Sequence, residues 1–210
     1  MGGKWEAVVK SVKHHLRRTV AETALTHEEL FTLLTQIEAI LNSRPLEPLT
    51  NDPEDIAALT PGHFLIGCPL VAVPEPSLLD LSTSGHSRWK LIQQRVQGFW
   101  SRWSSQYLQR QQSISKWHHP SNTIEVGSLV LLTDERTPPT RWPLARVVAL
   151  HPGKDGLTRV VTVKTATTSL VRPVTKLAPL PVSSAAAHSE ISSATVVADG
   201  GRKCLGKIEV

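Results

Sequence analysis

Residues 88–119, RWKLIQQRVQGFWSRWSSQYLQRQQSISKWHH, repeat large apolar side chains at the spacing of one helical face. A period near 3.6 residues is typical of an amphipathic helix with one buried side. The pattern therefore predicts a long helix whose core face carries Trp89, Ile92, Val96, Phe99, Trp100, Trp103 and Tyr107. Tryptophans can also serve as a stacking platform for bases, but the helical spacing of these favours packing.

Arginines flank the apolar face of this helix. Arg88, Arg95 and Arg102 are seven residues apart, and no acidic residue occurs between Leu81 and Ile124. We therefore expect the helix to pack on one side and to meet DNA phosphates on the other. Across residues 81–181 the chain carries fourteen Lys/Arg against four Asp/Glu, whereas residues 1–80 carry six against eleven. The basic middle region indicates a polyanionic partner, and mere solubility is the competing interpretation.

Beyond Thr123 the pattern changes from helical spacing to short runs of β-prone residues between turn residues. The runs cover 126–132, 142–150, 159–164, 168–172 and 173–177. Five short strands in so few residues are typical of a small barrel. The sequence predicts an SH3-like β-barrel over residues 123–181. The Ser/Ala-rich residues 182–210 lack periodicity and are predicted to be a disordered tail.

A second helix is predicted to begin at His27. Thr26 and Glu29 have the spacing of a capping box, and Pro45 cannot continue a helix, so the helix should end near Asn42. Its apolar stripe consists of Leu30, Leu33, Leu34, Ile37, Ile40 and Leu41. The Pro-rich residues 69–87 are predicted to be a linker between this helical unit, residues 1–68, and the long helix.

The first residues of the chain form another amphipathic pattern. Glu6, Lys10, Lys13 and Arg17 fall on one helical stripe, and an apolar stripe beside it is predicted to enter the core. The apolar stripe contains Trp5, Val8, Val9, Val12 and Leu16. A carboxylate beside basic residues suggests half of a DNA-processing site. A surface ion pair between Glu6 and Lys10 is the alternative.

Several function classes find no support in the sequence. Cys68 and Cys204 are far apart and lack the spacing of a zinc site or a disulfide framework. The pairs His14-His15 and His118-His119 have no accompanying Cys-x-x-Cys motif. No run of about 18 apolar residues is present, so the chain is expected to be intracellular, with no membrane partner.

Four segments together resemble the BEL/Pao-type retrotransposon integrases. They are Gly2-Gly3-Lys4-Trp5-Glu6, Asn42-Ser43-Arg44-Pro45-Leu46, Leu59-Thr60-Pro61-Gly62-His63-Phe64-Leu65, and the strand-rich residues 126–180. In that family a Gly-Gly-x-Trp-Glu motif carries the last carboxylate of an Asp, Asp, Glu triad. The resemblance implies that Glu6 is the catalytic metal ligand for Mg²⁺ or Mn²⁺, and that Lys10 and Lys13 contact the DNA end.

The resemblance also implies an α+β fold. The helical end of a ribonuclease-H-like core would occupy residues 1–68, followed by the linker 69–87, a basic helix over 88–119 and the barrel. The two aspartates of the triad lie upstream of the motif in the family, so the isolated chain is expected to be inactive. Glu38 is the rival carboxylate, but it lies among isoleucines and is interpreted as structural.

We therefore expect the C-terminal portion of an integrase that functions in the nucleus. Its partners would be DNA, the remaining part of the integrase or polyprotein, and further copies of itself in the full enzyme. Two alternatives remain open at the level of sequence. One is a host-domesticated, non-catalytic adaptor that binds chromatin or protein, and the other is a decayed reading frame.

Overall fold

The structure is a computed structural model and describes residues 3–20, 24–50, 52, 54–81, 87–118, 124–133 and 137–180. The side chains of residues 3–5, 7–8 and 113–118 are outside this description, as is the tail 182–210. Three helices and a five-stranded antiparallel sheet dominate the fold, which confirms the α+β class. The helices are α1 (Gly3–Val20), α2 (His27–Asn42) and α4 (Arg88–His118), and a short α3 (Pro61–Ile66) follows α2.

Helix α2 begins and ends where its sequence predicts. The side chain of Thr26 accepts a hydrogen bond from the Glu29 N–H, and the Glu29 carboxylate accepts one from the Thr26 N–H. This reciprocal capping box satisfies two of the N–H groups that a helix start leaves unpaired. Leu33, Ile37 and Ile40 are buried, whereas Leu30 and Leu34 at the edge of the stripe are partly exposed.

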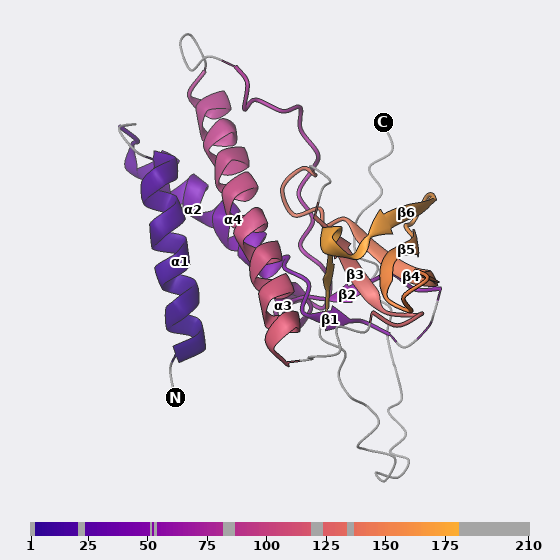
Figure 1. The fold of residues 1–210 in the computed structure, drawn as a ribbon. Helices are drawn as coiled ribbons and strands as arrows, with labels where there is room; N and C mark the ends of the chain where they lie inside the picture. The colour runs from indigo at the N-terminus through magenta and orange to yellow at the C-terminus, as the bar shows by residue number, and fades with distance from the viewer. Residues whose placement is uncertain are drawn as a thin grey trace, which may run out of the picture.

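Helix α4 lies between the other helices and the sheet, in contact with α1, α2 and β7 (Figure 1). Its buried face is the predicted one over most of its length, since Ile92, Val96, Phe99, Trp100 and Trp103 are all buried. Trp89 is the exception, because its side chain is 52% exposed at the first turn of the helix. The prediction that Trp89 belongs to the core is therefore wrong.

The sheet contains β3 (Leu129–Leu132), β4 (Leu144–Pro152), β5 (Thr158–Lys164), β6 (Ser169–Pro173) and β7 (Leu177–Pro179). A short 3-10 helix, Val174–Lys176, separates the last two strands, so the predicted closing strand begins later than expected. The strand order is β6-β5-β4-β3-β7, and β6 and β7 form the two edges. No pairing joins these edges among the described residues, so the predicted closed barrel is not confirmed.

Three groups of contacts connect the helical unit to the sheet. Trp142, which precedes β4, packs against both the helical core and the core beneath β3. Tyr107 of α4 packs against both cores and donates a hydrogen bond of 2.6 Å to the Pro45 carbonyl, and the Arg146 side chain of β4 binds the Asp55 carbonyl. A two-stranded ribbon, β1 (Glu47–Pro48) with β2 (Ala58–Leu59), frames this junction and was not predicted. The helical unit and the sheet therefore share a core.

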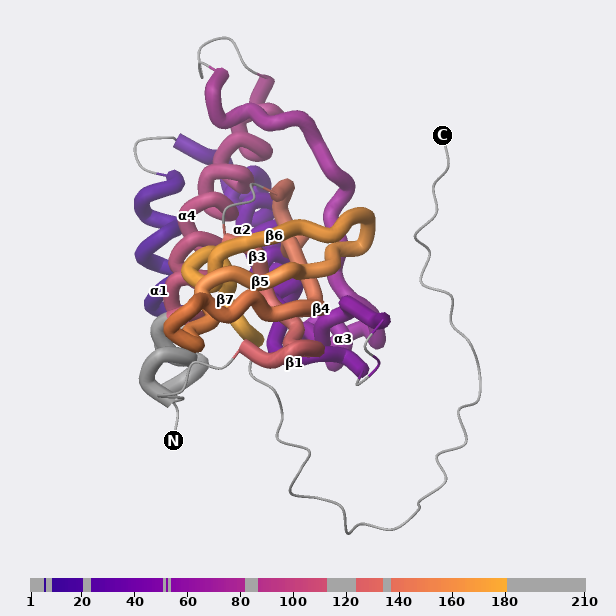
Figure 2. The backbone as a smooth tube through the Cα atoms, turned by 45° about the vertical axis from the view of Figure 1, so that its right-hand side comes forward, coloured from indigo at the N-terminus to yellow at the C-terminus, as the bar shows by residue number. Residues whose placement is uncertain are grey.

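The first part of the segment predicted as a linker runs along the outside of the molecule after α3 (Figure 2). Of this segment the structure describes residues 69–81, and hydrogen bonds hold them in place. Gln97 of α4 accepts from the Leu78 N–H at 2.7 Å and donates to the Pro76 carbonyl at 2.9 Å. The Ala72 N–H donates to Thr140 Oγ1 at 2.7 Å. We call residues 69–81 the strap.

Candidate nucleic-acid interface

The outer face of α1 carries the predicted basic stripe. Glu6, Lys10, Lys13 and Arg17 are all exposed, as their spacing along the helix predicts. His14 and Arg18 lie beside them, and the residues of this face line an open surface depression together with Val9. Sequence reasoning missed His14 and Arg18, although each directly follows a stripe residue and so lies only about 100° further around the helix. We call Glu6, Lys10, Lys13, His14, Arg17 and Arg18 the α1 basic face.

The inner face of α1 fixes the direction in which the basic face points. Val12 and Leu16 pack against the helical core, and His15 is buried. The Nε2 atom of His15 donates to Gln106 Oε1 of α4 at 2.6 Å. Val9 is 43% exposed and so does not belong to the core, contrary to the sequence prediction. Because polar and apolar contacts both lock the inner face onto α4, the basic face is held towards solvent.

The electrostatics of the α1 basic face favour an anion. The positive charge of Arg18 is the largest cause that lowers the pKa of His14, ahead of burial and of the neighbouring His15. Several cations thus share one small surface and raise the local positive potential. A phosphate bound there would offset this repulsion, which is the usual basis of backbone contacts to DNA.

Glu6 is exposed at the N-terminal end of this face. Catalysis by two metal ions needs carboxylates that converge from several elements of a fold. Within the described part of the chain, no three His, Cys, Asp or Glu side chains come together as such a cluster. Glu6 is thus not part of a cluster of three such side chains among the described residues.

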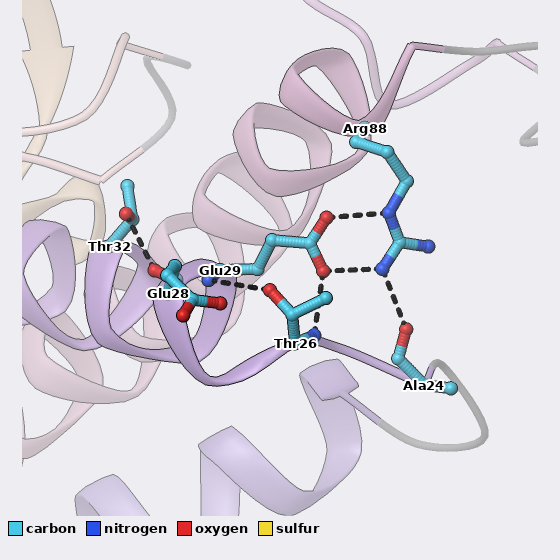
Figure 3. A network of polar contacts seen from close by, with 6 residues as sticks. All are labelled: Ala24, Thr26, Glu28, Glu29, Thr32 and Arg88. Carbon is cyan, nitrogen blue, oxygen red and sulfur yellow. Dashed lines mark hydrogen bonds and ion pairs between the residues drawn. The ribbon is translucent and has the colours of Figure 1, made fainter.

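Arg88 has an intramolecular partner. Its guanidinium binds both oxygens of the Glu29 carboxylate and donates to the Ala24 carbonyl at 2.9 Å (Figure 3). The hydrogen bond from Arg88 is the largest cause that lowers the pKa of Glu29, followed by the Thr26 N–H of the capping box. Arg88 thus ties the start of α4 to the start of α2. Its charge is already largely offset, which weakens it as a phosphate ligand.

Arg95 and Arg102, the other two arginines of the predicted stripe, lie on the same side of α4 as Arg88. Arg102 Nη1 donates to the carbonyl of Arg18 at 3.0 Å, so it caps the C-terminal turn of α1. Arg95 lies between them along the helix and is half-buried. Arg102 therefore contacts the C-terminal end of α1, and Arg88 contacts the start of α2. Lys10, Lys13 and Arg17 line the depression on α1, whereas Arg88, Arg95 and Arg102 are not among the residues that line it, although Arg102 contacts the Arg18 carbonyl.

Trp100 and Trp103 of α4 are core residues and do not form an open stacking platform. Trp100 and Trp103 are 5% and 6% exposed, and their rings pack against Tyr107 and Trp142. The ring centroids of Trp100 and Trp142 are 4.8 Å apart, at an interplanar angle of 72°. The indole N–H of Trp100 donates to the Thr137 carbonyl at 2.7 Å. These contacts fill the space between the rings and confirm the packing interpretation for Trp100 and Trp103.

Residues 87–180 match a family described as a family of unknown function (DUF5641). The matched region begins just before α4 and ends just after β7, so it coincides with the long helix and the sheet. No curated protein matches the chain, and no solved structure matches it. No helix within the described ranges is long and apolar enough to cross a bilayer.

Proposed function

We propose that this chain is the C-terminal portion of a BEL/Pao-type retrotransposon integrase and that it binds DNA through the α1 basic face. The observation that carries the proposal is the exposure of Lys10, Lys13 and Arg17 on one stripe, next to Glu6 of the Gly-Gly-x-Trp-Glu motif. In this proposal α1 and α2 are the end of a ribonuclease-H-like core, and the enzyme acts in the nucleus. Further copies and the rest of the integrase complete the assembly.

The sheet is consistent with the second part of the proposal. Five short antiparallel strands with a 3-10 turn before the last one suit a small SH3-like module that is open between β6 and β7. In the alternative function the module would be an adaptor that binds a methylated lysine between aromatic side chains. Trp142, the only aromatic residue after position 122, is used in packing against α4, which favours the integrase proposal.

Mg²⁺ or Mn²⁺ would be held in the intact enzyme by Glu6 together with the two aspartates of the family triad. Bound there, the metal ions would stabilise the charge on the oxygens that exchange at phosphorus. The chain itself contributes the Glu6 carboxylate. Lys10, Lys13 and Arg17, which lie one to three helical turns further along α1, position the DNA. This division of roles separates binding from catalysis, so the two can be tested independently.

The isolated chain should show no metal-dependent nicking or strand transfer, because one ligand cannot hold a two-metal site. The measurement is cleavage and joining of a labelled duplex by the purified chain in Mg²⁺ and in Mn²⁺. Activity that disappears in Glu38→Gln and persists in Glu6→Gln would contradict the assignment of Glu6. Activity lost in Glu6→Gln alone would show instead that this chain completes the site by itself.

Duplex DNA should bind the chain with little sequence preference and with an affinity that falls steeply as salt increases. The slope should be about 0.9 log units per log unit of salt for each phosphate neutralised. Reversing Lys10, Lys13 and Arg17 to Glu should weaken binding and flatten that slope. Fluorescence anisotropy with a labelled duplex over a salt series measures both quantities.

The matched control reverses the same number of charges elsewhere. Arg141, Lys154 and Lys176 are exposed on the sheet side of the molecule, and their replacement by Glu changes net charge equally. If the proposal holds, this control retains most of the affinity and nearly all of the salt slope. Equal losses in both variants would mean that net charge, and not the α1 basic face, governs binding. Thermal melts of both variants check that folding is unchanged.

A further inference from the structure

The strap presents an unusual backbone to solvent. Between Pro69 and Leu78 it contains no helix or turn and runs extended past the sheet and α4 (Figure 2). Within this extended stretch, residues 69–78, the hydrogen bonds to the rest of the described molecule use the backbone groups of Ala72, Pro76 and Leu78. All three residues have even numbers. In an extended chain the backbone groups of alternate residues point to opposite sides, so these even-numbered residues face the protein.

Val71 and Val73 consequently direct their N–H and C=O groups outward. The two residues are 60% and 80% exposed, and their backbone groups make no hydrogen bond to any other residue that the structure describes. Pro74 has no N–H, but in this alternation that group would have pointed towards the protein. Pro74 therefore does not interrupt the row of outward-facing backbone groups. A β-branched, extended segment with a free row of donors and acceptors has the properties of an unpaired edge strand.

We propose that two copies of this chain pair through residues 71–73, antiparallel, about a twofold axis that passes beside Ala72. Val71 of one copy then exchanges N–H···O bonds with Val73 of the other, and the reverse pair does the same. The two Ala72 residues face each other as the non-hydrogen-bonded pair between them. Pairing in this register leaves the Ala72 bond to Thr140 in place, since that bond lies on the opposite side of the strand.

The composition of the region favours a second copy as the occupant. No Asp, Glu, Lys or Arg occurs between Ile56 and Pro74. In the proposed register Ala72 meets its own copy on the axis and Val71 meets Val73, so this uncharged stretch brings no like charges together. Phe64, Leu65 and Ile66 of α3 are also more than half exposed and precede the strap in sequence. The chain as a whole carries a net charge of +5, which would oppose self-association through most other surfaces.

The strap is anchored firmly enough to act as a template. Gln97 is buried and uses both ends of its side-chain amide on the strap. Thr140 is buried with a φ of 65°, a left-handed conformation that is strained for a β-branched residue. Its hydroxyl nevertheless accepts the Ala72 N–H. A strand whose inward side is held in this way loses little conformational entropy when its outward side pairs.

Sedimentation equilibrium of the full chain without DNA tests the dimer. The chain should dimerise with increasing concentration, and Val71→Lys with Val73→Lys should raise the dimer Kd by about tenfold or more. The matched control is Val126→Lys with Val171→Lys, which places the same charges at two other exposed valines, one of them on the edge strand β6. A monomer at every concentration, or a control that weakens the dimer as much as the strap variant, would overturn the proposal.

Cross-linking tests the register. In a Cys68→Ser, Cys204→Ser background, Ala72→Cys should form a covalent dimer under mild oxidation, because facing residues of a non-hydrogen-bonded pair have Cα atoms about 4.5 Å apart. Ser77→Cys, in the same strap but far from the axis, should cross-link slowly. Equal rates for the two cysteines would contradict the pairing. Neither experiment involves DNA, so its outcome is independent of the DNA-binding proposal.

Discussion

Trp103→Ala should lower the free energy of unfolding by about 3–5 kcal/mol, the usual cost of removing a buried tryptophan from a core. The ring of Trp103 is stacked on Phe99 and Tyr107 and meets Trp142 edge-on at 5.9 Å. Its removal leaves a cavity where α4, the helical unit and the segment before β4 meet. Chemical denaturation followed by circular dichroism measures the loss.

Trp89→Ala is the matched control for this prediction. It removes the same side chain from the same helix, but at a position that is 52% exposed. Much less apolar surface returns to water, and no closed cavity forms, so the loss of stability should be well under half of that for Trp103→Ala. Similar losses for the two variants would contradict the placement of these rings.

Arg146→Met should destabilise the protein by about 1–3 kcal/mol for each carbonyl that is left buried without a donor. The Arg146 side chain is buried, and its Nη1 donates to the Gly127 carbonyl at 2.7 Å. Its Nε donates to the Asp55 carbonyl at 3.0 Å, and Nη2 binds the same oxygen. The Met side chain fills a similar volume but has no N–H group. The decrease in the free energy of unfolding therefore reflects lost hydrogen bonds more than lost packing. Urea denaturation gives the difference in free energy.

Arg159→Met provides the comparison for Arg146. Arg159 forms an ion pair with Asp155 at 2.6 Å, and both side chains are largely exposed. Exposed ion pairs contribute about 0–1 kcal/mol, because water screens them and ordering two long side chains costs entropy. A loss for Arg159→Met as large as that for Arg146→Met would mean that Arg146 does not hold the helical unit on the sheet.

Both large effects arise at the junction between regions that the sequence suggests are separate units. Trp142 and Arg146 are four residues apart, at the start of β4, and each contacts a segment before residue 60. The Asp55 carboxylate next to this junction has a lowered pKa, chiefly because the Thr50 hydroxyl and the Ala57 N–H bind it, with a smaller contribution from Arg146. The helical unit and the sheet should therefore unfold together in a single transition.

Sequence alone predicted the elements that depend on local signals. The start of α2 follows from Thr26 and Glu29, which are three residues apart, and its end follows from Pro45. The long helix and the five strands follow from periodicity. Some strands begin later than predicted because a turn occupies their first residues. The strand predicted over 126–132 begins at Leu129, because Gly127 has a φ of 93°, which does not occur in a strand.

Features that depend on distant residues were not predictable in the same way. The spacing of Arg88 and Arg102 shows that they share a side of α4, but not that the end of α1 and the start of α2 lie opposite that side. Trp89 fits the apolar period, yet its turn of α4 lies beyond the packed part of the core. For the candidate site, the stripe on α1 was predictable because a single helix determines it. The metal ligands expected beside Glu6 come from other elements, and periodicity says nothing about them.

Acetylation of lysines with and without duplex DNA tests the central claim most directly. The full chain is labelled briefly, and mass spectrometry gives the rate at each lysine. If DNA binds the α1 basic face, Lys10 and Lys13 become protected at low salt, and the protection disappears as salt rises, while the exposed Lys154 in the turn between β4 and β5 keeps its rate. Unchanged rates at Lys10 and Lys13 when DNA is bound, with protection at Lys154, would contradict the account.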